Sequence, residues 1–244
     1  MLLGAMPEKR HGPYSRRGIL GTMPTTGSPA LPRVLRALSA ILIIKVTLSV
    51  VLQYRDYFPP NFESDFLRGR ERYFWGPYHW AFFAHLISGP VCLMLGVILA
   101  SELFRRRVPL WHRRLGRVHV ACTLLLLAPS GLWMAYYAET GVIAATGLAS
   151  LALGTGACVA LGWRAAVARR FADHRRWMGR TFLLLCSAVV LRMIGGLATV
   201  AQWDVAWLYP VSTWASWLVP LAVFESAQFL EFRGSPRQRV ATET

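Results

Sequence analysis

The sequence lacks the short patterns that identify most soluble enzymes. It contains no glycine-rich nucleotide loop, no G-x-S-x-G nucleophile elbow and no closely spaced cysteine pair of the kind that holds zinc. Charge is scarce as well, because 16% of the residues are charged whereas 55% are hydrophobic. This composition excludes an ordinary soluble domain and predicts a protein embedded in a lipid bilayer.

Acidic residues and lysines are also few. The chain has 12 acidic residues against 27 basic ones, and only Lys9 and Lys45 are lysines. The formal net charge of +15 indicates an anionic partner. Because apolar runs dominate the chain, we expect that partner to be anionic lipid headgroups at the membrane surface, and we expect no nucleic acid.

What the sequence does contain is a series of long apolar runs. A membrane-spanning helix needs roughly 20 apolar residues, and six such stretches occur. They predict an all-α integral membrane bundle with six transmembrane helices at residues 34–54, 78–100, 118–137, 141–163, 181–200 and 207–230. The corresponding organisation is a disordered cytoplasmic tail at residues 1–32, a six-helix membrane domain at 33–232, and a cytoplasmic tail at 233–244.

The arginines predict the orientation of these helices. Most basic residues fall in four segments, residues 9–36, 105–117, 164–180 and 233–239. Positively charged loops are retained in the cytoplasm, so all four segments are expected on that side. Both termini are therefore predicted to be cytoplasmic, in a multi-pass protein of the cell (inner) membrane.

Four ionisable residues are expected near the middle of the bilayer: Lys45, His85, Arg192 and Glu225. A charge at that depth costs about 2.5–3.5 kcal/mol on insertion scales, so each needs a reason to be there. Arg192 and Glu225 are the natural ion pair. The layer could serve transport or proton movement, or it could be a structural ion pair beside a lysine that reaches toward the interface.

The most specific local pattern is a near repeat. His112-Arg113-Arg114 precedes the third span and His174-Arg175-Arg176 precedes the fifth, and Gly-Arg follows both within a few residues. Guanidinium groups at the start of a helix bind phosphate or carboxylate. The repeat could anchor anionic lipid, but its histidines could also bind iron or move protons.

These motifs carry a resemblance to a known family. His85 with Gly89, the stretch from Leu110 to Arg117, and His174-Arg175-Arg176-Trp177-Met178-x-Arg180 resemble the predicted bacterial membrane proteins called domain of unknown function 2306. The resemblance covers about residues 80–200. It implies a multi-pass helical membrane protein with His85, His112 and His174 as the positions of interest, and it implies no settled activity.

The chain is more distantly similar to the six-span, two-haem cytochromes b. Those proteins need four paired histidines, whereas the fourth span here has none. His85 and His112 are too far apart along the chain to share one haem. The likeness therefore implies at most one haem b, which would join His174 to His112 or His119. The candidate cofactor-binding residues are His112, His119, His174, Arg113, Arg175 and Arg176.

Three functions follow from these patterns. The first is a membrane redox protein that binds a b-type haem or a quinone. The alternatives are a small-molecule or proton transporter that uses the layer of Lys45, His85, Arg192 and Glu225, and a scaffold subunit that binds anionic lipid. Cys92, Cys122, Cys158 and Cys186 occur singly in four spans, which predicts apolar packing and no metal site. The patterns indicate neither an enzymatic reaction nor an oligomeric state.

Overall fold

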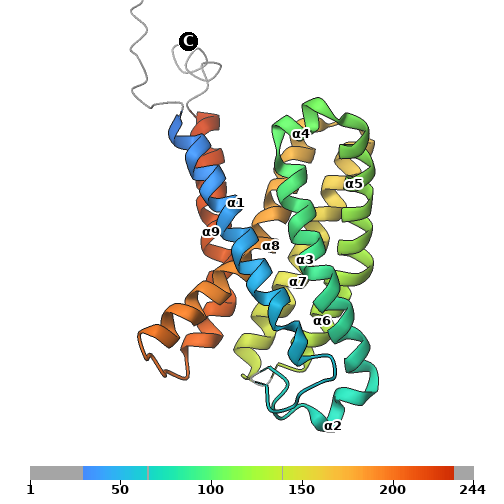
Figure 1. The fold of residues 1–244 in the computed structure, drawn as a ribbon. Coiled ribbons are helices and arrows are strands. Elements are labelled where there is room, and N and C mark those ends of the chain that lie inside the picture. The colour runs from blue at the N-terminus through green and yellow to red at the C-terminus, as the bar shows by residue number, and fades with distance from the viewer. Residues whose placement is uncertain (1–29, 65, 139, 234–244) are drawn as a thin grey trace, which may run out of the picture. The chain divides into compact units, whose positions relative to one another are not determined.

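The computed structural model describes residues 30–64, 66–138 and 140–233, and throughout these ranges the regular structure is helical, without a β-strand (Figure 1). The predicted all-α class is confirmed. Most of both predicted tails lies outside the described residues. The described parts are helical: residues 30–32 belong to the first helix and Arg233 ends the last one. The chain divides into two units after Ala37, and the packing described below concerns residues from Leu38 onward.

Nine α-helices are described. They are α1 (Ala30–Leu52), α2 (Glu71–Tyr73), α3 (His79–Ala100), α4 (Glu102–Arg107), α5 (Pro109–Cys122), α6 (Ala128–Tyr136), α7 (Val142–Val167), α8 (Phe171–Val200) and α9 (Leu208–Arg233). A 3-10 turn, Gln53–Asp56, follows α1, and π-helical turns at Phe74–Tyr78 and Thr123–Leu127 precede α3 and α6.

The second π-helical turn has a local cause. Pro129 lies two residues after its end and has no N–H to donate to the carbonyl of Leu125, so the regular hydrogen-bond ladder cannot continue through this point. Widening of the turn before the proline lets α5 and α6 continue as one run from Pro109 to Tyr136. That run is long enough to cross a membrane.

The interior of the bundle is built from α3, α5, α7 and α8, which lie side by side in Figure 1 and contact one another. Cys92 and Leu93 of α3 pack against Leu127, and against Leu185 and Val189 of α8. Cys92 is completely buried, as its assignment to apolar packing predicts.

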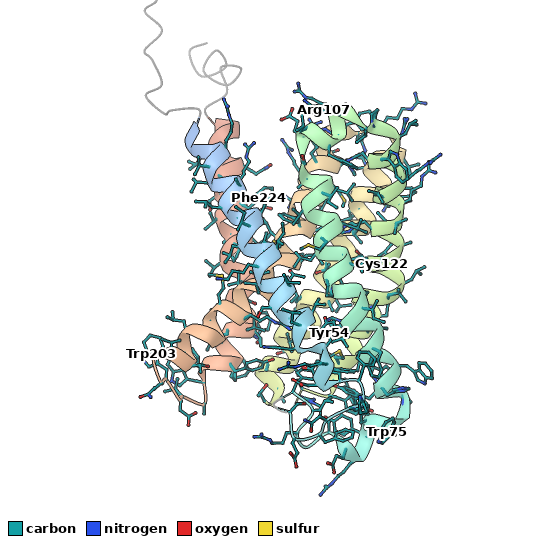
Figure 2. All side chains as sticks on the ribbon, in the orientation of Figure 1. Tyr54, Trp75, Arg107, Cys122, Trp203 and Phe224 are labelled. Carbon is teal, nitrogen blue, oxygen red and sulfur yellow. The ribbon has the colours of Figure 1, made fainter. Side chains whose placement is uncertain are left out.

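An aromatic cap covers one end of the bundle. Its buried residues are Leu67, Phe74, Tyr78 and Phe82, and further rings from the segment before α3 pack around them, as the side chains near Trp75 in Figure 2 show. Arg70 ties this cap to the end of α6, because its guanidinium donates to the backbone carbonyl of Tyr137 at 3.3 Å. The aromatic residues of the loop are therefore folded onto the helices.

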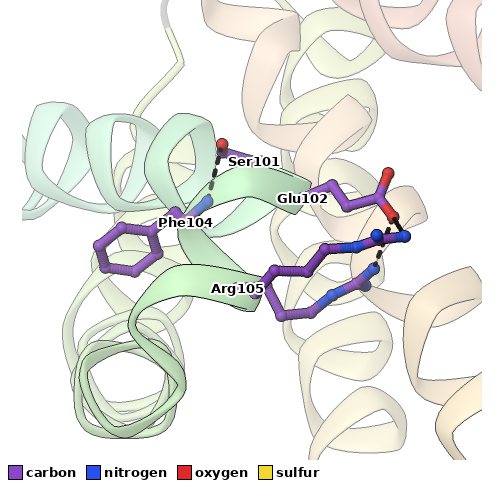
Figure 3. A network of polar contacts seen from close by, with 5 residues as sticks. Ser101, Glu102, Phe104 and Arg105 are labelled. Carbon is purple, nitrogen blue, oxygen red and sulfur yellow. Dashed lines mark hydrogen bonds and ion pairs between the residues drawn. The ribbon is translucent and has the colours of Figure 1, made fainter.

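The basic residues gather at the opposite end. Arg107 in α4 lies at the other end of the bundle from Trp75 in Figure 2. The connection into α4 is capped by Ser101, whose hydroxyl accepts from the backbone N–H of Phe104 at 3.3 Å, while Glu102 pairs with Arg105 and Arg106 (Figure 3). The starts of α5 and α8 add their arginines at this end.

Five helices in the described part of the chain are long and apolar enough to cross a membrane, where six were predicted. Their ranges are Arg33–Asp56, Glu71–Ala100, Pro109–Tyr136, Val142–Val167 and Phe171–Val200. The predicted sixth span corresponds to α9, which is 26 residues long but contains Pro220 and several polar residues. Three of these, Ser212, Thr213 and Ser216, are buried within the protein.

Candidate functional site

The partner of Glu225 differs from the predicted one. Arg180 holds this carboxylate with two hydrogen bonds, from Nε to Oε1 at 2.6 Å and from Nη2 to Oε2 at 2.8 Å. The same guanidinium lies 4.4 Å from the ring centre of Trp177. The predicted Arg192–Glu225 pair is therefore wrong. Helix α8 begins at Phe171, so Arg180 already lies about 14 Å along it and reaches the level of Glu225.

The other members of the predicted layer do not join Glu225. Arg192 is exposed, donates weakly to the carbonyl of Ala188 at 3.4 Å, and lies within electrostatic range of His85 and Tyr54. Lys45 is exposed on α1. The structure thus places His85 and Arg192 in one neighbourhood and Glu225 in another, on the contact between α8 and α9.

His85 is held against α6 by a polar contact. Its Nδ1 lies 3.3 Å from Oγ of Ser130, and this hydroxyl donates to the carbonyl of Leu127 at 3.1 Å. Because the Ser130 hydroxyl donates its proton to Leu127, its oxygen can only accept from Nδ1–H of His85. In the neutral ring, Nε2 of His85 then carries no proton and is a hydrogen-bond acceptor. Gly131 permits this approach, because a Cβ there would lie 3.2 Å from Cε1 of His85.

Ser130 also lines a groove that opens on the outside of the bundle. We call it the Ser130 groove; it has a volume of about 330 Å³ and is lined by Pro77, Trp80, Ala81, Ala84, Leu125, Leu126, Pro129, Ser130 and Trp133. Trp80 and Leu125 are each 73% exposed, so in a bilayer this surface faces lipid. Among the lining residues, the side chains with a polar atom are the two tryptophans and Ser130, which is 5% exposed.

Deeper in the bundle, α3 and α5 enclose polar atoms that have no partner within the described structure. These are Oγ of Ser88 and Nδ1 of His119, both in residues that are 1% exposed. Beside them, Thr123 donates to the carbonyl of His119 at 2.8 Å and contacts Sγ of Cys92 at 3.5 Å. A buried polar group without a partner costs about 1–3 kcal/mol, so these atoms mark a place where water or a ligand would be favoured.

The two histidines of the repeated motif lie near the starts of α5 and α8. His174 lies 2.9 Å through Nδ1 from the carbonyl of Gly162, which requires Nδ1–H and leaves Nε2 free. His112 is within electrostatic range of His174, and its Nδ1 is buried without a partner among the described residues. His119 lies seven residues further along the same run, about 10 Å deeper. No group of three metal-ligating side chains occurs in the described ranges.

The predicted arginines are all exposed, but their surroundings differ. Arg113 is exposed on α5. Arg175 and Arg176 line what we call the α8–α9 pocket, which has a volume of about 310 Å³. Its other lining residues are Ala172, Gly179, Phe224 and Gln228.

Sequence reasoning missed two functional candidates. Arg180 was visible as the last residue of the repeated motif, but nothing in the pattern connected it with Glu225. Ser130 gave almost no signal, because a helical serine satisfies its hydroxyl with a backbone carbonyl and costs little in an apolar run. Only the fold shows that it lies beside His85.

Comparison with known proteins agrees with the helical membrane architecture. Residues 82–227 match the family described as "Predicted membrane protein (DUF2306)". This match includes α5, α7, α8 and most of α3 and α9. No curated protein and no solved structure matches the chain.

Proposed function

This chain belongs to the DUF2306 family of predicted membrane proteins, and we propose that it is a redox protein of the cell (inner) membrane that binds the headgroup of a lipid-soluble quinone in the Ser130 groove. One observation carries the proposal. The groove is open toward lipid, has apolar and aromatic walls, and is lined by Ser130, whose hydroxyl contacts His85 behind the lining.

The chemistry of a quinone suits these walls. Its ring is flat and apolar and packs well against the indoles of Trp80 and Trp133. Its carbonyl oxygens accept hydrogen bonds, and the Ser130 hydroxyl can rotate from Leu127 to donate one. His85 contacts that hydroxyl and can take up or return a proton. The volume lies at the lower end of the usual range for small-molecule sites, about 300–1,000 Å³.

Binding of a short-chain ubiquinone analogue to the full chain in nanodiscs tests this proposal. Quenching of tryptophan fluorescence gives the affinity, and empty nanodiscs give the background from partitioning. Ser130→Ala should weaken binding by about two- to twelvefold, the worth of one hydrogen bond of about 0.5–1.5 kcal/mol. Ala84→Leu should weaken it further by filling the groove.

Ser212→Ala is the matched control. Its hydroxyl also donates to a backbone carbonyl of its own helix, that of Leu208 at 2.6 Å, but it does not line the groove. This variant should bind the analogue like the unaltered protein. Equal affinity in the Ser130, Ala84 and Ser212 variants would contradict the proposal.

A haem b between His112 and His174 is the second candidate. A histidine whose Nδ1–H is held by a backbone carbonyl, as in His174, presents Nε2 in the way that metal-ligating histidines do. A haem would supply one-electron transfer. We rank it second because neither the Ser130 groove nor the α8–α9 pocket is lined by a histidine. A Soret band that appears on haem supplementation and is lost in His174→Ala would support it, and its absence would remove it without affecting the quinone proposal.

We also propose the orientation that the arginines predict. Helix α9 is the sixth span, residues 33–232 form the membrane domain, and both tails lie on the cytoplasmic side, where the basic end of the bundle meets anionic headgroups. Transport through a single layer of Lys45, His85, Arg192 and Glu225 is less favoured, because Arg180 already engages Glu225.

A further inference from the structure

The α8–α9 pocket lies at the basic end of the bundle. It lies between the early turns of α8 and the second half of α9, the helix on which Figure 2 labels Phe224. Arg175 and Arg176 contribute its charge, Gln228 contributes an uncharged amide, and Phe224 forms an apolar wall. Nothing in the quinone proposal uses these residues.

The positive charge of this pocket is not cancelled by its acidic neighbours. Glu225 lies close enough to feel the charge of Arg176, but both of its carboxylate oxygens are bound by Arg180. Asp173, the nearby acid on α8, pairs with Arg170 at 3.5 Å. Arg175 and Arg176 are exposed and therefore accessible to an anion from outside the chain.

The kind of anion follows from the lining. Two guanidinium groups present planar arrays of N–H donors that match the oxygens of a phosphate, and the Gln228 amide adds another donor. About 310 Å³ holds a phosphorylated headgroup but is small for a macrocycle. Phe224 gives an apolar surface on which a glycerol or acyl carbon could rest.

We infer that the α8–α9 pocket binds a phosphate group through Arg175 and Arg176, with Gln228 as an additional donor. The phosphate can belong to an anionic lipid headgroup or to a soluble phosphorylated compound, because both present the same oxygens. The orientation proposed above places the pocket at the cytoplasmic leaflet, where anionic lipid is available. The assignment of the phosphate group itself does not depend on that orientation or on quinone binding.

The near repeat supplies a matched control for this inference. Arg113 and Arg114 of the first copy are exposed like Arg175 and Arg176, but they line neither of the two pockets described here, and Arg114 packs over Trp111. Arg175→Gln with Arg176→Gln and Arg113→Gln with Arg114→Gln remove the same charge from the same end of the bundle. Only the first pair removes the donors of the pocket.

Binding is measured with the purified full chain in detergent, using fluorescent short-chain phosphatidylglycerol, a diacylglycerol with the same chains and no phosphate, and glycerol 3-phosphate as a soluble competitor. We expect the variant of Arg175 and Arg176 to bind phosphatidylglycerol at least tenfold more weakly. The variant of Arg113 and Arg114 should change the affinity less than threefold. Lysine at both positions 175 and 176 should restore only part of the affinity, because it returns charge without the planar fork.

The competitor identifies the source of the phosphate. If glycerol 3-phosphate displaces the lipid at similar concentration, the site takes a soluble phosphate; if it does not, the site takes a lipid headgroup. Either result supports a phosphate site.

Equal losses of affinity in the two double variants would overturn the inference, since they would show that affinity follows net charge alone. Equal binding of the diacylglycerol without phosphate and of phosphatidylglycerol would also overturn it. Thermal unfolding of both variants confirms that each is folded.

Discussion

Breaking the ion pair between Arg180 and Glu225 should loosen the contact between α8 and α9. Three variants form a double-mutant cycle: Arg180→Gln, Glu225→Gln and the two together. Glutamine keeps the approximate length of each side chain while removing its charge, so the cycle isolates the interaction between the two charges from the loss of packing. We expect each single variant to be less stable than the unaltered protein and the double variant to lose less than the sum.

The size of the effect can be worked from the geometry. A hydrogen bond to a charged group contributes about 1.5–3 kcal/mol, whereas an exposed ion pair contributes about 0–1 kcal/mol. The side chains of Arg180 and Glu225 are 22% and 42% exposed, and two short bonds join them, so the pair lies between these limits. A coupling free energy of about 1–2 kcal/mol follows. For a protein of this size, that corresponds to about 2–8 °C in the midpoint of thermal unfolding.

The assay is thermal unfolding of the purified protein in detergent, followed by tryptophan fluorescence. A second cycle with Arg192→Gln and Glu225→Gln is the control, because the structure gives these residues no contact. We expect coupling in the first cycle and none above about 0.3 kcal/mol in the second. The reasoning would be refuted if the cycle of Arg192 and Glu225 gave a coupling free energy and that of Arg180 and Glu225 did not. It would also be refuted if the effects of the Arg180 and Glu225 variants on stability were simply additive.

Three further predictions test the packing and the orientation. Gly147→Ala should lower the unfolding midpoint by several degrees, because the added Cβ would lie 2.7 Å from Oγ1 of Thr213; Gly116→Ala, which meets nothing within 4 Å, should leave it unchanged or raise it slightly. Cys92 should resist maleimide labelling in the folded protein, because it is completely buried, and should react after unfolding; rapid labelling of a variant that keeps only this cysteine would contradict the core described here. A reporter fused after Arg107 should be active only when it is of the cytoplasmic type, and activity of a periplasmic reporter at that point would reverse the proposed orientation.

Most of the fold was predictable because the bilayer imposes a length on every span. The predicted stretch at 78–100 corresponds to α3, and the stretch at 141–163 begins within a residue of α7. The starts of other helices were predicted several residues too far toward the carboxyl terminus. The third predicted span begins at residue 118, whereas α5 begins at Pro109. Helices α5 and α8 begin in arginine-rich sequence that precedes their apolar runs, so hydropathy shows the apolar length of a helix and not its ends.

The candidate site was only partly predictable. The repeated motif predicted that His112 and His174 lie near the starts of two helices, and both do, in α5 and α8; their sharing of one ligand stays a prediction. The partner of Glu225 could not be predicted by counting residues along each helix to obtain depth in the membrane. Such a count assumes where the helix meets the membrane and how it is tilted. The Ser130 groove depends on which faces of α3 and α6 meet, and apolar sequences with weak amphipathicity do not specify that.

The Arg180–Glu225 pair should also control the phosphate affinity of the α8–α9 pocket, although Arg180 does not line it. Glu225 is held by Arg180 and lies within electrostatic range of Arg176. Removing the guanidinium in Arg180→Gln leaves a carboxylate that competes with phosphate for Arg176, so phosphatidylglycerol should bind several-fold more weakly. Glu225→Gln releases a cation beside the pocket and should bind the lipid at least as tightly as the unaltered protein. The double variant has neither charge and should return close to the original affinity. If the pair had only a structural role, both single variants would bind phosphatidylglycerol more weakly. Changes in affinity of opposite sign in the two single variants therefore indicate electrostatic control, whereas losses in both indicate loss of packing.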